Sequence, residues 1–209
     1  MTAFEHALLA ANAVWAAGLH RRHGWQLAAL AGCAAVLPDW DGIPLLIDAH
    51  AFAAGHRVWG HNLLVCLGLG LVVGGLDYRC DLVTRAARRL ICWLRRPAEI
   101  PPAGRTTFHA AGAGLWMLVA VAAMLSHLVG DLVVSGTAQL PDWELQRLWP
   151  FSDRGWVFPL VPWGDPGITL VFVGGMFAAA YWRSRLQPVG AMTLLLVAGY
   201  LIVRGMLGS

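Results

Sequence analysis

The sequence predicts an all-α fold, a polytopic membrane helix bundle of about six hydrophobic helices with one short interfacial helix. Hydrophobic residues make up 58% of the 209 residues and the mean hydropathy is +0.60, above the roughly 45–50% apolar share of soluble proteins. Only 13% of the residues are charged. The apolar residues gather in six runs between polar segments, so we expect residues 1–209 to form a single integral-membrane domain.

The six runs are expected to be the six helices. They cover residues 7–19, 25–37, 62–76, 110–134, 167–182 and 189–203. The first run ends at a His-Arg-Arg-His cluster and the second at Pro38, while Gly70 and Gly74 in the third have the GxxxG spacing that lets helices approach closely. Several runs are shorter than the roughly 20 residues that cross a bilayer, so these helices must borrow polar flanks, tilt or fail to cross.

The arginines predict the orientation, because all 15 basic residues are arginine. With the N-terminus outside, eleven arginines lie on the inner side, seven of them in an Arg-rich inner loop at 77–109. The other four lie outside, which agrees with the positive-inside rule. Within the inner loop, apolar pairs alternate with Arg85 and Arg88-Arg89 at helical spacing. This pattern predicts an interfacial helix on anionic headgroups; a solvated connecting helix is the alternative.

Charge and cysteine usage exclude other classes. The net charge of +3 is small and scattered, and no basic helix carries interleaved aromatic residues, so we expect no nucleic-acid partner. The four cysteines form no CxxC pair, which argues against a disulfide framework or a cysteine zinc site. The N-terminus also lacks the basic start of a cleavable signal peptide.

Carboxylates and imidazoles are concentrated between residues 37 and 62. This stretch contains Asp39, Asp41, Asp48, His50, His56, Arg57 and His61. With the predicted topology, most of these residues meet His6 and the one-face pair His127 and Asp131 at the outer membrane face. Such convergence favours a metal site over a solvated loop. We assign no site role to His20, His23, His50 or His109.

Five short motifs occur in one order along residues 6–154. They are His6 at the start of the first helix, LPDWD at 37–41, HRVWGHN at 56–62, HLVGD at 127–131, and LWPFSDR at 148–154. This order resembles the YdjM-like bacterial inner-membrane metal-dependent hydrolases, whose second motif reads HRxxTHS. Gly60 and Asn62 replace its Thr and Ser. The family is distantly similar to zinc-dependent phospholipases C, which implies phosphoester chemistry.

The chemistry of the donors suggests a role for each residue. The predicted metal ligands are His6, Asp39, His61, His127 and Asp131. Asp41 is predicted as a bridging ligand or as the base that accepts the water proton, and His56 as a ligand, a supporting residue or an acid. Arg57 and Arg154 suit the anionic oxygens of a substrate, although Arg57 could be a headgroup anchor and Arg154 could pair with Asp153 or Asp142. Asn62 is a tentative substrate contact.

We therefore expect a multi-pass inner-membrane hydrolase that cleaves a lipid or lipid-linked phosphoester with a metal-activated water, on the non-cytoplasmic face. A Trp/Pro-rich outer loop at 135–166 supports contact with the lipid bilayer. Zinc is the expected cofactor, as one to three ions, although manganese, iron or cobalt would suit the same donors. The alternatives are a metal-binding or metal-transporting membrane protein, or a structural metal site in an interaction subunit.

Overall fold

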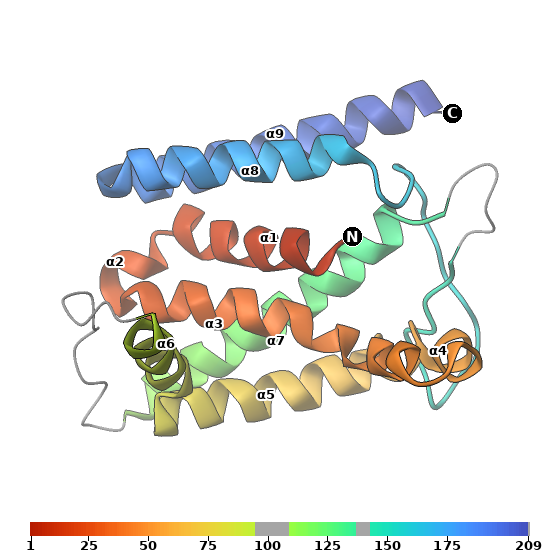
Figure 1. Cartoon of the computed structure of the whole chain (residues 1–209), viewed down its shortest axis with the longest axis horizontal. Helices are drawn as coiled ribbons and strands as arrows, with labels where there is room; N and C mark the ends of the chain where they lie inside the picture. Colours follow the sequence, from red (N-terminus) through yellow and green to blue (C-terminus); the bar gives the residue numbers. More distant parts are fainter. Residues whose placement is uncertain (95–108, 137–142, 209) are drawn as a thin grey trace.

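The computed structural model describes residues 1–94, 109–136 and 143–208, and their regular structure is helical apart from two isolated β-bridges. This confirms the predicted all-α bundle. Six longer helices make up most of the fold (Figure 1). They are α1 (Ala3–Ala16), α3 (Trp25–Val36), α5 (Leu63–Cys80), α7 (Ala110–Val133), α8 (Pro166–Tyr181) and α9 (Leu186–Gly208). The shorter elements are α2 (Leu19–His23), η1 (Leu37–Leu46), α4 (Ala49–Gly55), α6 (Leu82–Trp93) and η3 (Arg183–Arg185).

Several helices begin or end at other residues than predicted, because of local hydrogen bonds and backbone conformation. Helix α1 begins four residues early because Thr2 caps it and Glu5 completes the capping box. Helix α5 continues past the apolar run to Cys80, because Asp77 is buried and accepts a hydrogen bond from Trp116 on α7. Its end is fixed at Asp81, which adopts a left-handed conformation with φ 55°.

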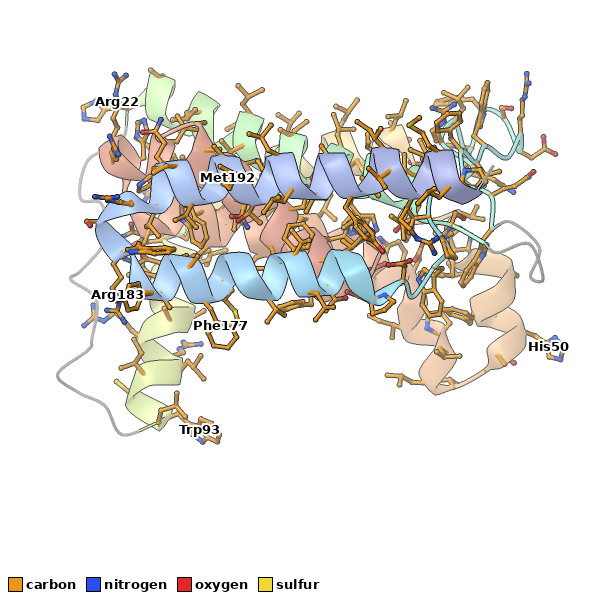
Figure 2. The ribbon with its side chains drawn as sticks, turned by 90° about the horizontal axis from the view of Figure 1, so that it is seen from above. Arg22, His50, Trp93, Phe177, Arg183 and Met192 are labelled. Atoms are coloured by element: carbon orange, nitrogen blue, oxygen red, sulfur yellow. The ribbon has the colours of Figure 1, made fainter. Side chains whose placement is uncertain are left out.

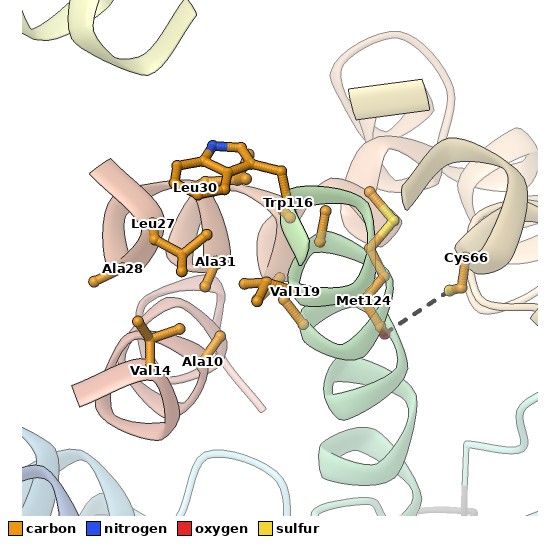
Figure 3. Packing of buried hydrophobic residues seen from close by; sticks show 14 of the residues in the cluster. Ala10, Val14, Leu27, Ala28, Leu30, Ala31, Cys66, Trp116, Val119 and Met124 are labelled. Atoms are coloured by element: carbon orange, nitrogen blue, oxygen red, sulfur yellow. Dashed lines mark hydrogen bonds between the residues drawn. The ribbon is translucent and has the colours of Figure 1, made fainter. Parts of the chain in front are cut away.

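Small side chains bring α5 and α7 together. A Cβ atom at Gly74 would lie 2.6 Å from the Cα atom of Met117, and one at Gly70 would lie 2.8 Å from that of Val121. Such contacts are too short for any residue except glycine, as the GxxxG spacing predicts. Cys66 of α5 donates a weak hydrogen bond to the carbonyl of Met124 at 3.8 Å (Figure 3).

The core consists of two apolar clusters. The larger one joins α1, α3, α5 and α7 and includes Leu27, Leu30, Trp116 and Met124 (Figure 3). A smaller cluster around Phe172 holds α8 and α9. Many other apolar side chains on the outside of the bundle are exposed, as expected for helices that face lipid.

Four segments of the described chain are long and apolar enough to cross a membrane: 25–46, 63–80, 110–133 and 183–207. Helix α8 is apolar but shorter, and α1 has 14 residues. All six predicted apolar helices are therefore present, but only four have the length expected of a span. The predicted inner loop at 77–109 contains the end of α5 and the whole of α6. Its residues 95–108 lie outside the described residues.

Candidate metal centre

Four segments that are distant in sequence meet at one end of the bundle and bring the predicted ligands together. His6 comes from the first turn of α1, Asp39 from η1 and His61 from the turn before α5. His127 and Asp131 lie one turn apart on α7. The side chains of His6, His61 and His127 are fully buried, and that of Asp131 is 4% exposed. Asp39 is the open member, with a side chain 28% exposed.

Four ligand atoms form a small cage: Nε2 of His61, Nε2 of His127, Oδ1 of Asp39 and Oδ2 of Asp131. The two nitrogens are 3.0 Å apart. The Asp39 oxygen lies 3.5 Å from each nitrogen, and the Asp131 oxygen lies 3.4 Å from His61 and 3.6 Å from His127. Ligands of a tetrahedral zinc ion at about 2.0–2.2 Å are separated by about 3.3–3.6 Å. Four of these five distances lie within that range and the two nitrogens are closer together, so the cage is close to the dimensions of a zinc site.

Hydrogen bonds on the far side of each imidazole determine which nitrogen faces the cage. Nδ1 of His127 lies 2.7 Å from the carbonyl oxygen of Ala35, and Nδ1 of His61 lies 2.9 Å from Oδ2 of Asp41. Each acceptor favours a proton on Nδ1, which leaves the lone pair on Nε2 directed into the cage. Histidine ligands of metals are commonly held by such carbonyl and carboxylate partners.

Asp41 lies behind His61 rather than beside the cage. Its Oδ2 accepts from Gly60 N at 2.8 Å as well as from His61, and its Oδ1 lies 2.7 Å from Nδ1 of His56. The carboxylate is fully buried and both oxygens have partners. This placement favours a role in orienting His61. Asp41, His56 and His61 also offer ligand atoms within 4.8 Å of one another, so the roles as bridging ligand or base stay predictions.

His6 and Asp131 form a second group of donors next to the cage. Nε2 of His6 lies 3.0 Å from Oδ1 of Asp131, while Oδ2 of the same carboxylate faces the cage. The His6 ring stacks on that of His127 with centroids 3.6 Å apart. Gly130 permits this approach, because a Cβ atom there would lie 3.0 Å from the His6 ring. Asp131 also accepts from the amino group of Met1. Nδ1 of His6 is buried without a hydrogen-bond partner, and such orphaned atoms often mark a missing bound group.

The field of the three carboxylates favours positive charge at the cage. Without a bound ion, burial lowers the pKa of His61, but hydrogen bonds from the doubly protonated ring, at Nε2 to Asp131 and Asp39 and at Nδ1 to Asp41, outweigh that effect and raise the pKa to about 10; a metal ion would take the place of the Nε2 proton. A field strong enough to hold a proton on a buried imidazole would also favour a divalent cation among the same side chains. The donor set, its dimensions and its charge thus all fit a metal ion.

Arg57 is buried next to the cage, with 2% of its side chain exposed. Nη1 donates to Ser135 Oγ at 2.9 Å and to the carbonyl of Trp143 at 2.6 Å, and Nη2 lies 3.5 Å from Oδ2 of Asp131. Its backbone is left-handed, with φ 64°, a strained conformation that surrounding contacts must hold. The burial contradicts the alternative of a headgroup anchor. Arg57 therefore lies beside the carboxylate of Asp131, one of the predicted ligands.

His56 lies at the more open side of the site, where its side chain is 14% exposed. It stacks on Phe52 with ring centroids 4.7 Å apart and meets the edge of Trp143 at 4.9 Å. Its Nδ1 faces Asp41, which favours a proton on Nδ1 and leaves Nε2 free to exchange one. The position next to Asp41 suits a supporting residue or an acid, and the three donors Asp41, His56 and His61 are close enough together for the ligand role as well.

Two predicted substrate residues lie elsewhere. The amide of Asn62 caps α5: its oxygen accepts from Val65 N, and its nitrogen donates to the carbonyls of Val58 and Trp59. Both terminal atoms have partners within the chain, which favours a role as helix cap over the predicted substrate contact. Arg154 is exposed and lies 4.4 Å above the Trp156 ring. Its contact with Trp156 and its exposed position do not bring it to the cage. One of its predicted partners, Asp142, lies outside the described residues.

The histidines that received no site role also lie away from the cage. His50 is exposed at the far tip of α4 (Figure 2), and His109 caps the opposite end of α7 from Asp131. Three residues that support the site were not predicted from the sequence. Ser135 follows Asp131 by four residues, a spacing that could have revealed it. The carbonyls of Ala35 and Trp143 gave no signal, because any residue type supplies a carbonyl.

Comparison with known proteins gives a family but no characterised relative. A family model described as YdjM inner membrane protein matches residues 1–209. Neither a curated protein nor a solved structure matches the chain. The name of this family states the membrane in which its members reside and states no activity.

Proposed function

We propose that the chain, which belongs to the YdjM inner membrane protein family, is a membrane-embedded metal-dependent hydrolase that cleaves the phosphoester of a lipid or lipid-linked substrate. The observation that carries the proposal is the four-atom cage of Asp39, His61, His127 and Asp131, in which the two imidazole nitrogens lie 3.0 Å from each other and 3.4–3.6 Å from each carboxylate oxygen. His6 and the second oxygen of Asp131 provide donors for a further ion. Zinc is the ion that this donor set suits best.

The other residues of the site have separate roles in the proposed reaction. When bound, zinc lowers the pKa of a coordinated water toward about 7 and so supplies a nucleophile at neutral pH. Asp41 and the Ala35 carbonyl hold the two imidazoles in position. His56, partly exposed and backed by Asp41, exchanges a proton at Nε2 with the attacking water or the leaving oxygen. The buried guanidinium of Arg57 adds positive charge beside Asp131, where negative charge develops on a phosphoester.

The surroundings of the site favour a lipid substrate. Beyond Asp41, η1 and the residue that follows it expose apolar side chains, with Ile43 59%, Leu46 86% and Ile47 88% exposed. They follow Asp39 in a segment that packs against α4, the helix that ends just before His56, and Asp39 and His56 are the two more open members of the site. A lipid whose headgroup reaches this opening would keep its chains against an apolar surface, whereas a soluble phosphoester would gain nothing from it.

The test is hydrolysis by the purified full chain in detergent micelles, after removal of metal with a chelator and after return of zinc. Phosphatidylglycerol, phosphatidic acid and bis(p-nitrophenyl) phosphate are suitable probes. We expect zinc-dependent release of product, lost in His127→Ala and retained in the matched control His50→Ala. Zinc-loaded protein that cleaves none of the probes, or cleavage that persists in His127→Ala, would contradict the proposal.

A further inference from the structure

Helix α6 (Leu82–Trp93) lies crosswise to the bundle. Figure 1 shows it almost end-on while the longer helices run across the view, and Figure 2 shows it side-on and perpendicular to α8 and α9. If the long helices cross the bilayer, α6 lies along the membrane surface. It occupies the end of the bundle opposite the metal centre.

Hydrogen bonds at the start of α6 hold this crosswise orientation. Val83 N donates to Oδ1 of Asp77 at 2.8 Å, and the buried hydroxyl of Thr84 donates to Oδ1 of Asp81 at 3.1 Å. The other oxygen of Asp77 accepts from Trp116 Nε1 on α7 at 3.0 Å. The corner between α5 and α6 is therefore tied to the core, and the orientation of α6 is a built feature of the fold.

The exposed surface of α6 has two faces. Leu82 is 46% exposed, Leu90 55% and Trp93 77%; at 100° per residue these side chains share one arc of the helix. Arg85, Arg88 and Arg89 are exposed on the neighbouring arc. In the part of the chain that the structure describes, no carboxylate forms an ion pair with these three arginines. An apolar arc next to an unpaired cationic arc is typical of helices that lie in the membrane interface.

Other arginines at the same end of the bundle share this location. Arg22 of α2 and Arg183 of η3 lie with α6 at the end opposite His50 (Figure 2). Positive charge gathered at the end of the bundle that also carries the exposed apolar arc of α6 is complementary to a leaflet with anionic headgroups. A solvated connecting helix would have no reason to expose Leu90 and Trp93, because its apolar side chains would be better covered by the bundle.

We propose that α6 is a membrane-surface helix that binds the phosphate groups of anionic lipids through Arg85, Arg88 and Arg89, with Leu82, Leu90 and Trp93 immersed among the acyl chains. The partner is the leaflet at the end of the bundle opposite the metal centre. This interaction is independent of the hydrolase proposal and involves none of the residues of the site.

The test uses a fluorescent label on Leu90→Cys in the full chain, reconstituted in vesicles of phosphatidylcholine alone or mixed with phosphatidylglycerol. Cys33, Cys80 and Cys92 are replaced by serine, while Cys66 stays because it is buried and unreactive. Spin-labelled acyl chains should quench the label more than aqueous iodide does, and phosphatidylglycerol should strengthen that preference. R85Q/R88Q/R89Q should remove the phosphatidylglycerol effect, with about a fivefold loss of lipid affinity per arginine.

The matched control is R147Q/R154Q, which removes the half-buried Arg147, bonded through its carbonyl to the start of α5, and the exposed Arg154; it should leave the label unchanged. Quenching by iodide in both lipid compositions would overturn the proposal in favour of a solvated helix or one that binds another partner. Deep acyl-chain quenching that is insensitive to phosphatidylglycerol and to R85Q/R88Q/R89Q would overturn the recognition of anionic headgroups.

Discussion

Asp41→Asn distinguishes a carboxylate that orients a ligand from one that binds the metal or accepts the water proton. Asparagine has the same shape but no charge, and only one of its two terminal atoms can accept hydrogen bonds. The amide oxygen can still accept from His61 Nδ1 and Gly60 N, now at 2.9 and 2.8 Å. The amide nitrogen then faces His56, whose Nδ1 can become an acceptor in the other tautomer.

The expected cost follows from these contacts. The variant keeps the orientation of His61 but loses the negative charge that makes the imidazole a stronger ligand. Removal of such an outer partner weakens metal binding by about 10–100-fold, or about 1.4–2.7 kcal/mol. Because each donor keeps a partner, we expect the fold to remain intact and most of the hydrolysis to return at saturating zinc.

The assay is equilibrium dialysis against chelator-buffered zinc, with bound metal counted by elemental mass spectrometry and hydrolysis measured on the same samples. Asp48→Asn is the matched control, since Asp48 lies in the same segment but only caps α4. Unchanged zinc affinity with lost hydrolysis would refute the reasoning and make Asp41 the base. Absence of bound zinc at every concentration would make Asp41 a direct ligand.

Three further predictions concern single positions. Asp131→Ala should abolish zinc binding, whereas His109→Ala at the far end of α7 should leave the metal content unchanged; full zinc content in a folded Asp131→Ala protein would contradict the ligand assignment. Gly74→Ala should lower the stability of the bundle, measured by thermal unfolding, by about 1–3 kcal/mol because the added methyl group overpacks the contact with α7. Gly68→Ala should not, because its Cβ atom would meet nothing within 4 Å. Equal effects of the two substitutions would contradict the role of Gly74 in the close contact. Asn62→Ala should lower the stability of the protein by about 1 kcal/mol, because the cap of α5 is lost, and should leave the rate of hydrolysis per folded molecule unchanged. A lower turnover at full stability would instead support its role as a substrate contact.

The sequence was sufficient to predict much of the fold because its apolar runs are separated by distinct polar and proline-containing segments. All six apolar helices and the amphipathic α6 are present. Their ends were harder to place, since they depend on single hydrogen bonds. The capping box of Thr2 and Glu5 was readable in advance, whereas the burial of Asp77 depends on Trp116, a residue 39 positions away.

The candidate site was predictable as a set of donors but not as a geometry. Charge is rare in this chain, so the carboxylates and histidines at one membrane face were visible, and the structure gathers His6, Asp39, His61, His127 and Asp131. The division of roles was not visible. Asp39 and Asp41 are two residues apart in the same motif, yet one faces the cage and the other lies behind His61, because η1 directs their side chains differently.

The most direct measurement of the central claim is the metal content of the purified full chain by elemental mass spectrometry, beside the Asp39→Ala/His127→Ala double variant. Both substitutions remove cage ligands, and circular dichroism establishes that each protein is folded. The cage predicts at least one equivalent of a divalent metal, zinc above all, in the wild-type chain and its loss from the double variant. A folded wild-type chain that binds no divalent metal even when zinc, manganese and iron are supplied would contradict the claim and make these residues a buried polar network.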